Sequence, residues 1–162
     1  MTEITSIPQP QSGQPYEVNG VLYNADAIVA TWVQEQMGSD ALVEAGFVAL
    51  GIVDPNGASA SFRERLIAGC YFHGHKPGQD IWVAAAMTQA AASHRSAIRQ
   101  ILAYPFRDLG LMRVSAEISE TNARSIEQAR ILGFTKDGTK RVNGDVWGYW
   151  SLYRDNCPFW AN

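Results

Sequence analysis

A glutamate near the end of a predicted strand is the side chain best suited to proton transfer. Over residues 112–118, Arg113, Ser115 and Glu117 alternate with apolar residues and therefore share one face of the strand. A carboxylate at this position either forms an ion pair with Arg113 or faces a cleft. In a cleft it can take a proton from an ammonium group, directly or through water. The pattern predicts one of these two roles for Glu117 and leaves the choice open.

Other chemical motifs are weak or absent. His73 and His75 alternate on a predicted strand and face the same side, but no third ligand stands at a spacing diagnostic of a metal site, so we predict none. Cys70 and Cys157 lack CxxC spacing and are expected to be thiols in a reducing cell interior. Cys70 lies in an apolar stretch, which favours an inert core thiol over a nucleophile. The chain contains no GxxxxGKS/T, HExxH or GxSxG motif.

The composition is typical of one globular domain. The chain has 162 residues, of which 46% are apolar, and this is enough to bury a core. A net charge of −3 argues against a large phosphate-binding surface, so we do not expect nucleic acid as a partner. The first residues lack the apolar region of a signal peptide, and no apolar run approaches membrane-spanning length. We therefore expect a cytoplasmic protein without a membrane partner.

The first half of the chain is predicted to be strand-rich. Residues 1–15 are expected to form a flexible lead, and residues 16–162 a single domain. Asn19-Gly20 predicts a short hairpin, and a helix is expected from a cap at Asn24 or Asp26 to Gly38. Three strands at 47–53, 65–73 and 80–87, separated by turns at 54–57 and 77–78, predict an antiparallel meander.

Helices and strands alternate in the second half. A helix capped by Ser93 or Ser96 precedes the strand at 112–118, and a helix capped by Thr121 or Asn122 follows it and ends at Gly133. Turns are expected at 137–138 and 143–144, before a last strand at 146–153. The order predicts an α+β or mixed α/β fold, in which helices cover the faces of a mixed sheet.

The segment around the third helix carries a family resemblance. It resembles the C-terminal signature of the GNAT-type N-acetyltransferases and is nearest to the ribosomal-protein type, with the pattern N-x-x-S…L-G-F-x-x-E-G-x-x-R. The residues that carry it are Asn122, Ser125, Ile126, Leu132, Gly133, Phe134, Asp137, Gly138 and Arg141. The flanking segments 106–114 and 145–155 are similar to the same family, so the resemblance covers about residues 61–155.

The resemblance implies the GNAT fold, a mixed sheet flanked by about four helices, and transfer of an acetyl group from acetyl-CoA to a primary amine. The acceptor would be a protein N-terminus, a lysine or a small molecule. In this fold two central strands splay apart, and the pantetheine arm pairs with the main chain of the strand that corresponds to Asp80–Met87. Ala85, Ala86 and Met87, together with the preceding Ala84, would lie nearest to the arm.

Asn122 and Ser125 would also contact the cofactor, although helix capping alone explains Asn122 nearly as well. The phosphate loop departs from the family pattern Q/R-x-x-G-x-G/A, because residues 89–96 contain no glycine. Ser93, Arg95 and Ser96 are then expected to bind phosphate through their side chains, and the alternative is that coenzyme A binds poorly or not at all.

The catalytic groups also match the family pattern only in part. Many members carry a tyrosine acid seven residues after the asparagine, where this chain has Ala129. Glu117 matches the general base of some N-terminal acetyltransferases, and Tyr149 or Tyr153 is expected to replace the acid. We therefore predict an N-acetyltransferase. The alternative is a catalytically degenerate GNAT-fold module for protein–protein interaction, and a homodimer stays open.

Overall fold

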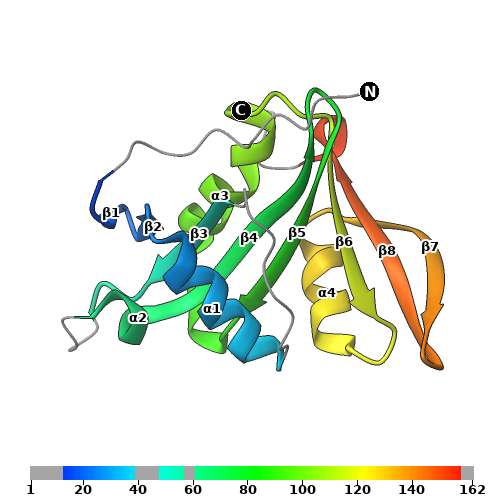
Figure 1. Cartoon of the computed structure of the whole chain (residues 1–162), viewed down its shortest axis with the longest axis horizontal. Coiled ribbons are helices and arrows are strands. Elements are labelled where there is room, and N and C mark those ends of the chain that lie inside the picture. Colours follow the sequence, from blue (N-terminus) through cyan, green and yellow to red (C-terminus); the bar gives the residue numbers. More distant parts are fainter. Residues whose placement is uncertain (1–12, 39–47, 57–60, 158–162) are drawn as a thin grey trace.

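The computed structural model describes residues 13–38, 48–56 and 61–157, in which eight strands form one continuous sheet (Figure 1). The strand order is β1-β2-β3-β4-β5-β6-β8-β7, and every neighbouring pair is antiparallel except β5 and β6. Fold class is thus confirmed as a mixed α/β sheet. The strands are β1 (Tyr16–Val18), β2 (Val21–Tyr23), β3 (Val48–Val53), β4 (Leu66–Lys76), β5 (Asp80–Met87), β6 (Arg113–Ser119), β7 (Thr135–Val142) and β8 (Asp145–Tyr153). The helices are α1 (Asp26–Met37), α2 (Phe62–Arg65), α3 (Arg95–Arg107) and α4 (Ala123–Ile131).

The local turn signals of the first half are confirmed. Asn19 and Gly20 both have positive φ, 50° and 85°, as a tight two-residue hairpin between β1 and β2 requires. Strands β3, β4 and β5 form the predicted antiparallel meander, and β4 continues beyond the predicted end to Lys76. The expected flexible lead lies outside the described residues as far as residue 12.

Two predicted helix caps are wrong. Helix α1 begins after Ala25, and Asp26 does not cap it. The Asp26 carboxylate instead accepts a hydrogen bond of 3.0 Å from the main-chain N–H of Ala49 and so ties α1 to β3. Helix α3 begins after His94, without a side-chain cap from Ser93 or Ser96. The predicted end of α1 is confirmed, because Gly38 adopts the left-handed conformation with φ of 65°.

The predicted turn at Asp137-Gly138 is also wrong. These residues lie inside β7, where the pairing with β8 shifts between Lys136 and Gly138. One additional residue in β7 forms a β-bulge, which accommodates the turn-like sequence without reversing the chain. The turn at Asn143-Gly144 is confirmed by positive φ at both residues.

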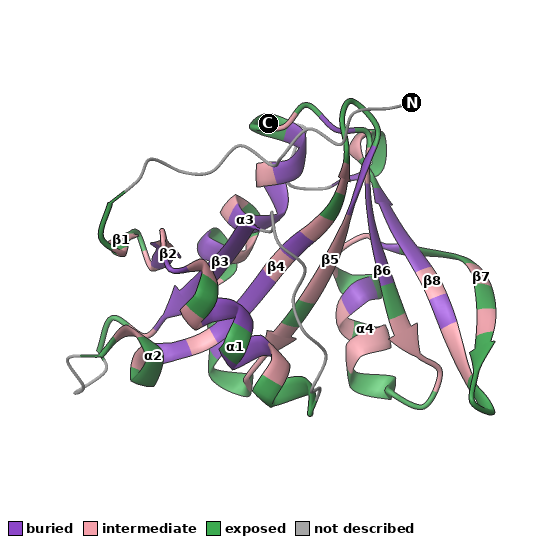
Figure 2. Ribbon diagram, viewed as in Figure 1, coloured by how far each residue is buried: buried purple, intermediate pink, exposed green. Residues whose placement is uncertain are grey.

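Helix α1 covers one face of the sheet, and α3 and α4 cover the other (Figure 1). The α3–α4 face holds the larger apolar core, which includes Phe72, Phe106 and Trp150. Buried residues are concentrated along β3, β4 and the inner side of α1, whereas β7 is largely exposed (Figure 2). None of the described helices is long and apolar enough to span a membrane.

Candidate functional site

Strands β5 and β6 separate halfway along their length. They pair only where Asp80–Trp82 lie beside residues 113–115, and beyond this point the two strands diverge (Figure 1). Helix α4 lies beneath the opening, and a cavity of about 1000 Å³ occupies it. One wall is formed by residues 83–87 of β5 and the other by residues 116–119 of β6.

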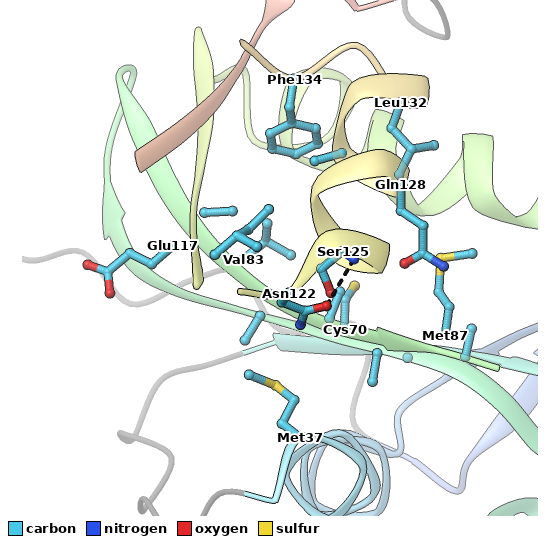
Figure 3. A pocket seen from close by; sticks show the side chains of 18 of the residues that line it. Met37, Cys70, Val83, Met87, Glu117, Asn122, Ser125, Gln128, Leu132 and Phe134 are labelled. Carbon is cyan, nitrogen blue, oxygen red and sulfur yellow. Dashed lines mark hydrogen bonds between the residues drawn. The ribbon is translucent and has the colours of Figure 1, made fainter. Parts of the chain in front are cut away.

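The cavity extends through the sheet from one face to the other. Met37 at the end of α1 lines it on one side, and Gln128 of α4 and Leu132 just after α4 line it on the other side (Figure 3). A bound molecule could therefore contact both faces at once, and two reactants could approach each other from opposite sides of the sheet.

Main-chain groups of β5 point into this opening. In an antiparallel ladder, alternate residues direct their N–H and C=O groups to opposite neighbours. The Gln79 carbonyl accepts a hydrogen bond from Arg113 on the β6 side at 3.0 Å, and the Thr88 N–H donates to Ile67 on the β4 side at 2.9 Å. The odd-numbered residues of β5 therefore face β6. Ala85 and Met87 present main-chain groups to the cavity, whereas those of Ala86 bond to β4.

A buried carboxylate links β5 to β6 in the short stretch where the two strands pair. Asp80 is 3% exposed and accepts hydrogen bonds of 2.9 Å from the Ser115 hydroxyl and from the Arg113 guanidinium. One of the two roles predicted for Glu117, an ion pair with Arg113, is therefore not observed. Instead, Asp80 at the start of the paired stretch joins β5 to two residues of β6, of which Ser115 belongs to the last pair before the strands separate.

Glu117 lies at the edge of the cavity on the side of the sheet opposite α4 (Figure 3). Its exposed carboxylate accepts a hydrogen bond of 2.8 Å from Lys140 of β7. Tyr149 on β8 is its Cα partner, and the Tyr149 ring lies 6.1 Å from the Trp82 ring. The structure thus brings Tyr149 beside Glu117, but Tyr149 itself does not line the cavity.

The start of α4 faces the cavity from the opposite side. Asn122 accepts a hydrogen bond of 3.1 Å from the Ser125 N–H and is therefore the side-chain cap of the helix. Both residues also line the cavity, as Figure 3 shows. The cap prediction is confirmed for Asn122. The same side chain would contact a molecule bound in the cavity.

The loop between β5 and α3 is a compact 3₁₀ turn, Gln89–Ser93. Its main-chain N–H groups at Ala91 and His94 donate within the turn, and the Ser93 hydroxyl donates to the Ala90 carbonyl at 3.2 Å. Ser93, together with Arg95 and Ser96, is exposed and does not line the cavity. Phosphate binding by these three side chains stays a prediction.

Sequence reasoning missed two basic residues at the site. Arg124, in the first turn of α4, reaches across the opening and donates to the Met87 carbonyl at 3.3 Å. Lys140 reaches Glu117 from β7, although β8 lies between β7 and β6 in the sheet. Both contacts depend on the tertiary arrangement of segments distant in sequence, so no local pattern indicates them.

The other candidate groups are inert or incomplete. Cys70 lines the cavity, but complete burial raises the pKa of its thiol to about 12, which disfavours the nucleophilic thiolate at neutral pH. No group of three His, Cys, Asp or Glu residues suited to a metal ion occurs within residues 13–38, 48–56 and 61–157.

The structure is similar to several solved structures of acetyltransferases. The ribosomal-protein-S5-alanine acetyltransferase of Vibrio fischeri is 15% identical, with a TM-score of 0.61 over 90% of this chain and 99% of its own. A protein of T. thermophilus assigned as an acetyltransferase is 14% identical, with a TM-score of 0.61 over 94% and 96%. A variant of the spermidine N-acetyltransferase of Vibrio cholerae is 14% identical, with a TM-score of 0.54 over 68% and 66%.

Comparisons of the sequence with protein-family models and with curated proteins find no match. The similarity therefore lies in the three-dimensional fold. On this evidence the chain has the fold of the GNAT N-acetyltransferases.

Proposed function

We propose that the protein transfers an acetyl group from acetyl-CoA to a primary amine. The observation that carries the proposal is the cavity between β5 and β6, which passes through the sheet and is lined on one wall by main-chain groups of β5. A thioester held along β5 would be reached by an amine that enters from the α1 side.

The cavity suits the extended arm of acetyl-CoA. The amides of such an arm need hydrogen-bond partners of both kinds, and the odd-numbered residues of β5 offer N–H and C=O groups along the opening. Ala85 and Met87 would bind the arm, and small side chains at Ala84–Ala86 leave room for it. Asn122 and Ser125 would contact it from α4, while Ser93, Arg95 and Ser96 would meet the phosphates.

The chemistry requires a proton acceptor, a polarised carbonyl and a proton donor. Glu117 would accept a proton from the acceptor ammonium, and the freed amine would attack the thioester carbon. Main-chain N–H groups of β5 would stabilise the negative charge that develops on the carbonyl oxygen. The thiolate leaves as the C–N bond forms, and Tyr149, the Cα partner of Glu117, would donate a proton to it. No enzyme nucleophile is needed, because the acceptor amine supplies the attacking electron pair.

Acetyl-CoA binding and thiol release test the proposal directly. We expect calorimetry to detect acetyl-CoA binding, and we expect thiol release to depend on an added amine from a panel of peptides, lysine derivatives and polyamines. Glu117→Gln should lower kcat at least 100-fold, the usual contribution of a general base. Glu127→Gln, at an exposed position on α4, is the matched control and should leave kcat unchanged. Absence of both binding and thiol release would overturn the proposal.

One observation favours a second candidate, a GNAT-fold module that mediates protein–protein interaction without catalysis. The loop at Gln89–Ser93 uses main-chain N–H groups of its own in internal hydrogen bonds, whereas a phosphate loop needs such groups free. Calorimetry with coenzyme A separates the two candidates. Binding that weakens on removal of the phosphates favours the enzyme, and no binding at millimolar coenzyme A favours the module.

A further inference from the structure

The Glu117 carboxylate already holds an alkylammonium group that belongs to the protein. The Nζ atom of Lys140 lies 2.8 Å from this carboxylate and 5.6 Å from the centroid of the Tyr149 ring. An anionic oxygen on one side and an aromatic face on the other are the two surroundings that an ammonium group prefers. The position thus has the surroundings of a binding site for a protonated primary amine.

The sheet register explains how Lys140 comes to be there. Lys140 pairs with Trp147 of β8, and Trp147 pairs with Ser119 of β6. The adjacent row on the same face contains Glu117 and Tyr149. Lys140 therefore points to the same face as Glu117 and reaches diagonally across β8. Its side chain is 33% exposed, and Glu117, to which it bonds, lines the cavity.

We propose that Lys140 is itself an acceptor, and that the protein acetylates this lysine when acetyl-CoA is bound and no other amine is present. The inference rests on the proposed function, because it uses the same thioester and the same base. It adds a modification site. It also identifies the preferred acceptor class as an alkylammonium of the lysine type, because the protein's own lysine occupies the position beside Glu117 and Tyr149.

The reaction balances without any further reactant. The Lys140 ammonium loses one proton to Glu117, and the resulting amine attacks the thioester carbonyl while Glu117 still holds this proton. Glu117 releases the proton to water afterwards. A C–N bond forms and the C–S bond breaks. The thiolate takes up the second proton that nitrogen loses, so the products are acetyl-lysine, the free thiol of coenzyme A and one proton in solvent. Acetylation removes the positive charge, and Lys140 then no longer neutralises Glu117.

Lys136 is a matched control within the same strand. It also forms an ion pair with a glutamate, Glu120, so its ammonium has similar electrostatic surroundings. It differs in position, because Lys136 pairs with Trp150 of the α3–α4 core and Glu120 does not line the cavity. A lysine that reacts only because it is exposed or ion-paired should behave like Lys136.

The test incubates the full chain with acetyl-CoA in the absence of any acceptor and follows acetylation of each lysine by peptide mass spectrometry. We expect Lys140 to be acetylated at least tenfold faster than Lys136, at a rate per molecule that does not change with protein concentration. Glu117→Gln should lower the Lys140 rate at least tenfold and leave the Lys136 rate unchanged. Lys136→Arg should leave acetylation of Lys140 unaffected. Equal rates at the two lysines, or no effect of Glu117→Gln, would overturn the inference.

A second measurement separates this inference from the proposed function. Lys140→Arg removes the internal acceptor and leaves Glu117, β5 and α4 in place. If Lys140→Arg protein acetylates an added amine in a Glu117-dependent manner while wild-type Lys140 stays unmodified, the proposed function stands and self-acetylation is refuted. If neither an added amine nor Lys140 is acetylated although acetyl-CoA is present, both are refuted.

Discussion

Asp80 on β5 and Arg113 on β6 form an ion pair of 2.9 Å at the start of the short stretch over which the two strands pair. The Asp80 side chain is buried, whereas that of Arg113 is 40% exposed. The same carboxylate also accepts the hydroxyl of Ser115, so both of its oxygens are satisfied by β6. The paired stretch that precedes the separation of the strands is thus held by side chains as well as by main-chain pairing.

Replacement of Asp80 by Asn should destabilise this end of the sheet. Asn retains an acceptor for Ser115 but turns a donor towards Arg113, which leaves a guanidinium without its partner. We expect the free energy of unfolding to fall by about 2 kcal/mol, below the range for a fully buried pair because Arg113 is partly solvated. Urea denaturation measures the change.

The matched control for Asp80 is Asp108→Asn, which breaks the exposed pair between Arg107 and Asp108. An exposed pair contributes less than about 1 kcal/mol, so this variant should unfold close to wild type. Equal losses for the two variants would show that the Asp80 contacts do not hold the strands together.

Gly69 on β4 should tolerate no side chain, because α1 packs directly on it. A Cβ atom there would lie 2.9 Å from Val29 Cγ1 and 3.1 Å from Val33 Cγ2. Gly69→Ala should therefore displace α1, which carries Met37 to the cavity, and cost about 1–3 kcal/mol in urea denaturation. At Gly138 a Cβ would make only an ordinary contact of 4.0 Å with Tyr149, so Gly138→Ala should change stability by less than about 0.5 kcal/mol.

Substitutions at Asn122 can separate helix capping from cofactor binding. Asn122→Ala removes the acceptor for the Ser125 N–H and should cost about 1 kcal/mol of stability. Asn122→Asp keeps the acceptor and places a negative charge at a helix N-terminus, so it should unfold like wild type. If the Asn122 amide also donates to acetyl-CoA, Asn122→Asp should weaken binding about tenfold in calorimetry. Unchanged binding by Asn122→Asp would leave Asn122 with the capping role alone.

Features that depend on neighbouring residues could be predicted from the sequence. The hairpin at Asn19-Gly20, the helix end at Gly38 and the cap at Asn122 each need only a few adjacent residues, because left-handed φ and capping are local properties. The strand alternation also placed Glu117 on the correct face of β6, away from the α4 side.

Features that depend on distant segments could not be predicted. Asp26 does not cap α1 as expected, because its carboxylate accepts a hydrogen bond from Ala49, 23 residues away. Arg113 forms its ion pair with Asp80, 33 residues away, and not with Glu117. This pairing depends on the parallel alignment of β5 with β6. The bulge in β7 follows from pairing with β8, so a dipeptide that usually turns the chain continues as a strand instead.

The pH dependence of Lys140 acetylation should show whether Glu117 takes part. The hydrogen bond from Lys140 to Glu117 raises the pKa of the Lys140 ammonium, so the lysine is protonated at neutral pH and the free amine is scarce. If acetylation needed an amine deprotonated by solvent, the rate would rise about tenfold per pH unit below that pKa. If Glu117 accepts the proton within the pair, the reactive species is the ion pair itself, and its population does not rise as the pH approaches the pKa of Lys140 from below. We therefore expect a nearly flat profile for Lys140 in wild-type protein and a steep rise for Lys140 in Glu117→Gln and for Lys136 in both, measured by peptide mass spectrometry. A steep rise at Lys140 in the wild type would exclude Glu117 as its base.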